Sequence, residues 1–93
     1  MIILLSNATA NGAGQEAALE QPLKDWPRTL QIWGTFDGAN VTIEVSPDGI
    51  QWNPITDGSF TFAIVKDLRV SSMKIHAVVS SAGASTDLNA AIT

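Results

Sequence analysis

Apolar and polar side chains alternate over short stretches of this chain, and the clearest series runs from Leu30 to Ile55. Leu30 and Ile32 flank a polar residue, and Val41 begins a second series of the same kind. A period of two is typical of a β-strand that buries one face. The pattern predicts an all-β chain with about seven strands, over residues 1–5, 28–35, 40–46, 50–55, 59–65, 73–80 and 88–92.

Turn-forming residues separate these stretches. The pair Asp-Gly is favoured in tight hairpins because its second position tolerates a positive φ. The predicted turns are Asp37-Gly38, Pro47-Asp48-Gly49, Thr56-Asp57-Gly58 and the small polar segment 81–86. The apolar positions then change parity, from Leu68 and Val70 to Ile75, so we expect a bulge or a crossing between two sheets near Ser71-Ser72.

These segments fit one domain over residues 1–93, because a chain of this length forms a single thin core. The predicted fold class is a small antiparallel β-sandwich, Ig-like or jelly-roll-like, and a closed barrel would also suit the pattern. Residues 7–27 are small and polar, and Pro22 and Pro27 leave no room for a helix to grow. We interpret this segment as an extended N-terminal arm, which either lies across a neighbouring subunit or pairs partly as an edge strand.

Charge and composition narrow the function classes. Nine acidic and five basic residues give a net charge of −4, which opposes the phosphate contacts of nucleic-acid binding. Cysteine is absent, so disulfides and thiolate chemistry are excluded. The apolar run at residues 1–5 lacks the basic residue of a signal peptide, and no stretch approaches the roughly 20 apolar residues of a membrane span. We expect a soluble product of cytoplasmic synthesis with no membrane partner.

No motif in the sequence points to catalysis. His76 is the only histidine, and no nucleophile or orienting group accompanies it in a known motif. Its alternation with Ile75 and Ala77 places it on an outward face, as a surface or interface residue. The three turn aspartates stand in separate loops, whereas a calcium site requires about six to eight oxygen ligands. We therefore expect no enzyme activity, no cofactor and no metal.

The three tryptophans differ in their expected surroundings. Trp52 closes a turn and is expected to fold back over it, and Trp26 is expected to pin the arm to the sandwich. Trp33 shares the polar face of its strand with Gln31, where a neighbouring subunit, a carbohydrate ring or another strand would cover it. Because aromatic residues are enriched at protein interfaces, we favour subunit contact, with Trp33, Gln31, Trp26 and His76 as candidate interface residues.

Three segments carry a resemblance to a known group of proteins, namely NATANGAG, GTFDGANVTIEVSPDGIQW and SSMKIHAVVSSAGASTDLNAAI. Together they resemble small phage virion structural proteins, in which a GTFxGAxVTxxxSPDGxxW core precedes an alternating final strand. The segment SPDGIQW is also similar to the Asp-box of sialidase-type propellers, SxDxGxxW, with one residue missing. An Asp-box is a folding element, so this second likeness does not imply hydrolysis.

The resemblance to virion proteins implies assembly. The first hypothesis is a capsid decoration or cement protein, made in the host cytoplasm and located in the virion, that binds and stabilises the major capsid protein or other virion subunits. It would act as a homo-oligomer, and a trimer at a local three-fold axis is one option. The alternative is a receptor- or glycan-binding module on the tail or the capsid exterior.

Overall fold

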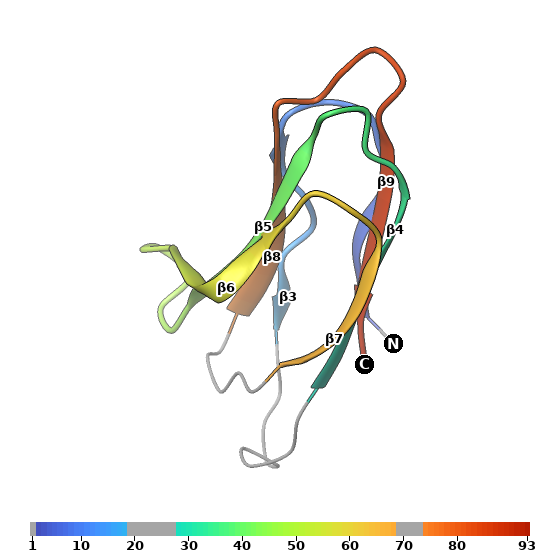
Figure 1. Cartoon of the computed structure of the whole chain (residues 1–93). Helices are drawn as coiled ribbons and strands as arrows, with labels where there is room; N and C mark the ends of the chain where they lie inside the picture. Colours follow the sequence, from blue (N-terminus) through green and yellow to red (C-terminus); the bar gives the residue numbers. More distant parts are fainter. Residues whose placement is uncertain (1, 19–27, 69–73) are drawn as a thin grey trace.

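The computed structural model describes residues 2–18, 28–68 and 74–93, and these contain nine β-strands and no helix. The strands are β1 (Ile2–Ala8), β2 (Gly12–Ala13), β3 (Ala17–Ala18), β4 (Arg28–Thr35), β5 (Asn40–Ser46), β6 (Asn53–Phe60), β7 (Ile64–Leu68), β8 (Lys74–Ser80) and β9 (Asp87–Ile92). They form two antiparallel sheets that face each other (Figure 1). The all-β sandwich predicted from the alternation is therefore confirmed.

The two sheets draw their strands from distant parts of the chain. The four-stranded sheet has the order β1-β9-β4-β7, and the five-stranded sheet has the order β2-β8-β5-β6, with β3 also paired to β8. Ile2 pairs with Ile92, so the first and last strands lie side by side. β7 belongs to one sheet and β8 to the other. The crossing that the change of parity predicted is thus confirmed, although Ser71-Ser72 themselves lie outside the described residues.

The core between the sheets consists of the inward residues of the alternating pattern. In the four-stranded sheet Leu30 and Ile32 are 0% and 1% exposed, and in the five-stranded sheet Val41 and Ile43 are both fully buried. Burial of a side chain of this size contributes about 1.5–3 kcal/mol. Each strand contributes a single row of inward side chains, so the core is thin, as expected for a chain of this length.

The hairpin turn predicted at Thr56-Asp57-Gly58 is wrong, because β6 runs straight through these residues. The pairing with β5 jumps from Thr42↔Ser59 to Glu44↔Pro54, so the extra residues of β6 form a large bulge. Asp57 takes the left-handed conformation there, with φ of 57°. A Cβ on Gly58 would lie 2.4 Å from Cγ1 of Ile55, so this glycine is required by packing. The chain reverses instead at residues 61–63, on its way from one sheet to the other.

The described part of the expected arm lies against its own domain. Gly12–Ala13 and Ala17–Ala18 pair with β8 and form the edge of the five-stranded sheet. Between them, the amide of Gly14 donates to the carbonyl of Ala77 at 2.7 Å, and the amide of Gln15 donates to the carbonyl of Leu4 at 3.0 Å. The arm was predicted to begin at residue 7, but residues 7 and 8 belong to β1. Residues 12–18 follow the edge-strand alternative, and residues 19–27, which include both arm prolines and Trp26, lie outside the described residues.

Candidate functional site

An uncharged surface lies at the centre of the outward side of the four-stranded sheet. Its residues come from all four strands, and we call it the Trp33 face: Ile3, Gln31, Trp33, Val65, Asn89 and Ala91. The register aligns four of them in one row across the sheet, in the order Ile3, Ala91, Gln31, Val65. Trp33 pairs with Asn89 in the neighbouring row. The face is therefore continuous from one edge of the sheet to the other.

The alternation of each strand explains why these side chains point outward. Leu30 and Ile32 of β4 fill the core, so Gln31 and Trp33 between them face away from it. Three large apolar side chains of the Trp33 face stay accessible, since Ile3, Trp33 and Val65 are 37%, 38% and 64% exposed.

Ala91 is only 2% exposed although it is absent from the core cluster. Its register partners Ile3 and Gln31 carry larger side chains that flank its methyl group.

The Trp33 face carries no formal charge, in contrast to the net charge of −4 of the whole chain. A carboxylate stands in the adjoining outward row at each end of the face: Asp67, whose Oδ1 accepts a hydrogen bond from Oγ1 of Thr29 at 3.3 Å, and Asp87, the register partner of Thr35. Interface centres are depleted of charged residues and enriched in tryptophan. A flat, neutral sheet face with an accessible indole therefore has the composition of a protein-binding surface.

The structure brings together only two of the four candidate interface residues. Trp33 and Gln31 lie on the Trp33 face, as the alternation predicted. His76 also points away from the core, but it belongs to β8 in the opposite sheet, and it is 7% exposed. Trp26 lies outside the described residues. Four residues of the face were not predicted, because the sequence does not show which strands are neighbours in the sheet: Ile3, Val65, Asn89 and Ala91.

His76 is covered by Trp52 of its own chain. The two rings stack with centroids 3.7 Å apart and planes 8° apart. Nε2 of His76 lies 2.8 Å from Oε1 of Glu44, its register partner on β5. Trp52 was predicted to fold back over its own turn, and the contact that the structure shows is with His76 on the outer face of the five-stranded sheet.

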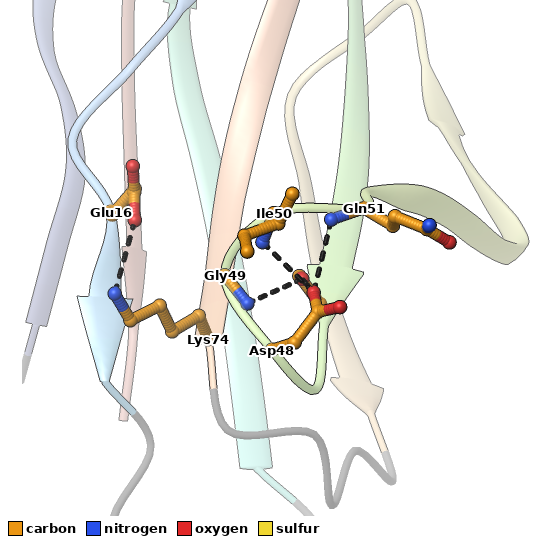
Figure 2. A network of polar contacts seen from close by, with 7 residues as sticks. Glu16, Asp48, Gly49, Ile50, Gln51 and Lys74 are labelled. Atoms are coloured by element: carbon orange, nitrogen blue, oxygen red, sulfur yellow. Dashed lines mark hydrogen bonds and ion pairs between the residues drawn. The ribbon is translucent and has the colours of Figure 1, made fainter.

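The loop before Trp52 is built around the carboxylate of Asp48 (Figure 2). Its Oδ1 accepts hydrogen bonds from the amides of Ile50 and Gln51 at 2.9 and 3.0 Å, and from the hydroxyl of Ser46 at 2.9 Å. These bonds, led by those from Gln51 and Ile50, lower the pKa of Asp48 from 3.8 to about 2. Asp48 therefore has the turn role that the sequence predicted, and Ile50 at the tip is 81% exposed.

Other kinds of site receive little support from the part of the chain that is described. Within residues 2–18, 28–68 and 74–93, His, Asp and Glu side chains do not gather in threes as metal ligands would. The described residues also contain no helix of the length and apolar character needed to cross a membrane.

We compared the chain with protein-family models, with curated proteins and with solved structures, and none of the three comparisons found a match. Among the described residues, the Trp33 face is the candidate site that geometry and composition favour.

Proposed function

We propose that this chain is a phage virion structural protein, and specifically a capsid decoration or cement protein that binds major capsid subunits through the Trp33 face. The observation that carries the proposal is the neutral, partly apolar surface, on which the side chain of Trp33 is 38% exposed. The likeness of the segment GTFDGANVTIEVSPDGIQW to small virion proteins supports the choice of partner. No reaction is part of this proposal, because the protein acts by binding.

Such a protein stabilises a shell by mass action. Binding to the assembled shell and not to its dissociated subunits adds RT ln(1 + [L]/Kd) for each occupied site, about 2.7 kcal/mol when the free protein is at 100 times its Kd. The protein itself needs no conformational change for this effect.

The size of the Trp33 face bears on the number of copies that bind together. The two rows of the face span four strands about 4.8 Å apart and about four residues of 3.3 Å along each strand, which gives a flat area of roughly 250 Å². A stable interface usually buries about 800 Å² on each partner. One face is therefore a weak contact by itself, and linking several copies would raise the overall affinity. This estimate supports a homo-oligomer, such as the trimer expected above.

The decisive experiment measures how many copies remain on purified particles. Trp33→Ala is compared with Ile50→Ala, which removes an even more accessible apolar side chain from the loop on the other sheet. Loss of a central interface tryptophan typically costs at least about 2 kcal/mol, or roughly 30-fold in affinity. We expect Trp33→Ala to lower the copy number strongly and Ile50→Ala to leave it unchanged. Full occupancy by a folded Trp33→Ala variant would overturn the proposal.

Removal of the first 27 residues is an unsuitable test of attachment. Leu4 and Leu5 are 0% and 4% exposed in the core, and β1 pairs with β9 along its length. The truncation would therefore remove an edge strand together with the arm. We expect it to unfold the domain, so a loss of attachment would not report on the arm.

One observation favours a second candidate, a receptor- or glycan-binding module. The indole of Trp33 lies beside the amide side chains of Gln31 and Asn89, and stacking on an aromatic ring flanked by amides suits a sugar. The side-chain oxygen Oδ1 of Asn89 already accepts a hydrogen bond from the backbone amide of Asn7 at 3.0 Å. A glycan array would separate the two functions, because sugar binding that disappears in Trp33→Ala, together with unchanged particle occupancy, would favour this module.

A further inference from the structure

The two lateral sides of the sandwich differ in how their edge strands are protected. On one side, the hydrogen bond from the amide of Gln15 to the carbonyl of Leu4 links the edge of the five-stranded sheet to β1 of the other sheet. The opposite side is formed by β6 and β7, and the chain passes from one to the other there (Figure 1). Among the described residues, each of these strands pairs with one neighbour only.

An edge strand with free backbone groups can add a strand from another molecule. β6 is a poor template because its bulge breaks the ladder and Pro54 supplies no amide hydrogen. β7 is different, since its five residues pair with β4 in an uninterrupted register. Its outward residue Val65 is 64% exposed. β7 is therefore the strand on which addition would be expected.

Lys66 lies at the centre of β7 and points inward, opposite Leu30 of β4. Its side chain crosses the open side of the sandwich toward β6. Nζ donates a hydrogen bond to the carbonyl of Asp57 at 3.3 Å and lies 5.6 Å from the centroid of the Phe60 ring. The ammonium group thus lies between the two strands β6 and β7.

A second copy of this chain is the most available partner for β7. In an antiparallel β7–β7 pairing over the full strand, Ile64 of each copy would face Leu68 of the other, and the two Lys66 residues would face each other. Like charges directly opposite in a sheet are destabilising. An added strand would also cover the ammonium group of Lys66, and the burial of an unpaired charge costs free energy.

We propose that Lys66 keeps the β7 edge from pairing with a second copy of this chain, so that copies associate only through other surfaces. The side chain does this in two ways, by placing a charge at the centre of the edge and by linking the edge to β6. This role does not depend on the proposed function, because it concerns the free protein.

The test compares the masses of the wild-type protein, Lys66→Met and Lys66→Arg by size exclusion with light scattering, at matched micromolar concentrations. Lys66→Met keeps a long side chain without the charge, and Lys66→Arg keeps the charge. We expect the mass of Lys66→Met to at least double relative to wild type, and that of Lys66→Arg to be unchanged. Adding Val65→Lys to Lys66→Met returns a charge to the same edge and should restore the wild-type mass.

Three results would reject the proposal. The first is a wild-type mass for a Lys66→Met variant whose circular dichroism shows the native fold. The second is an equal increase in the mass of Lys66→Arg, which would show that the charge at position 66 does not prevent association. The third is an association that persists in the double variant, because it would lie away from β7. If Lys66→Met does not fold, Lys66→Gln is measured with the same criterion.

Discussion

Gly14 allows a sharp test of how the N-terminal segment closes the sandwich. A Cβ added at this position would lie 2.3 Å from the carbonyl oxygen of Leu4 and 2.5 Å from Cδ2 of Leu5. Carbon and oxygen atoms normally approach no closer than about 3.3 Å. In Gly14→Ala, either residues 13–15 or β1 must therefore move by about 1 Å. The φ of Gly14 lies outside the left-handed region, so the effect is steric and not conformational.

The cost of this substitution follows from the contacts that the movement breaks. Overpacking of a closely packed site costs about 1–3 kcal/mol. The movement also weakens the hydrogen bonds of Gly14 to Ala77 and of Gln15 to Leu4, which are 2.7 and 3.0 Å long, and a lost bond costs about 1 kcal/mol. We expect Gly14→Ala to lower the free energy of unfolding by about 2–4 kcal/mol. For a chain of this size the melting temperature should fall by roughly 10–30 °C.

Urea unfolding followed by tryptophan fluorescence measures this difference, with a slope of roughly 1 kcal/mol/M for a domain of this length. Ala13→Ser is the matched control, because it adds one heavy atom at the adjacent exposed position of β2. It should change stability by less than about 0.5 kcal/mol. If Gly14→Ala also stays within about 0.5 kcal/mol of wild type, the close approach of this segment to β1 is refuted.

Two further predictions concern the outer face of the five-stranded sheet, in addition to those for Trp33 and Lys66. Trp52→Ala removes the ring stacked 3.7 Å from His76 and should cost about 1–3 kcal/mol in urea unfolding. A double-mutant cycle with His76→Ala should show a coupling of about 0.5–1.5 kcal/mol, and additive effects would exclude the stack. Asp48 has its pKa lowered from 3.8 to about 2 in the folded protein, so its stabilisation is present above pH 4 and is lost as the pH falls toward 2. Urea midpoints measured between these pH values should fall less in Asp48→Asn than in wild type, and parallel profiles would contradict this role.

The same dipeptide, Asp-Gly, shows where local sequence stops being informative. At Asp37-Gly38 both residues have positive φ, 48° and 84°, and the chain turns as predicted. The turn is not a tight hairpin, however, because it leads from β4 in one sheet to β5 in the other. At Asp57-Gly58 only the aspartate has a positive φ, 57°, and the chain continues as a bulged strand. The difference arises because β6 pairs with β5 on both sides of the bulge and Ile55 packs against Gly58. Both causes are contacts that the dipeptide does not encode.

His76 shows that solvent exposure, too, cannot be predicted from local sequence alone. Its position between Ile75 and Ala77 correctly predicted a side chain that points away from the core. Its low exposure, 7%, could not be predicted because Trp52, which covers it, is 24 positions away in the sequence. Alternation determines which face of a strand a residue occupies, whereas burial on that face depends on what packs over it.

The sequence alone determined the strand period, the inward and outward residues of β4, β5, β8 and β9, and most of the turn chemistry, because all of these depend on residues within a few positions of one another. The tertiary structure decided which strands are neighbours. It therefore decided that Ile3, Ala91, Gln31 and Val65 share one row, and that Lys66 reaches across to β6. The physical reason is that sheet pairing joins segments far apart in the chain, and many pairings satisfy the same alternation until the whole core is packed.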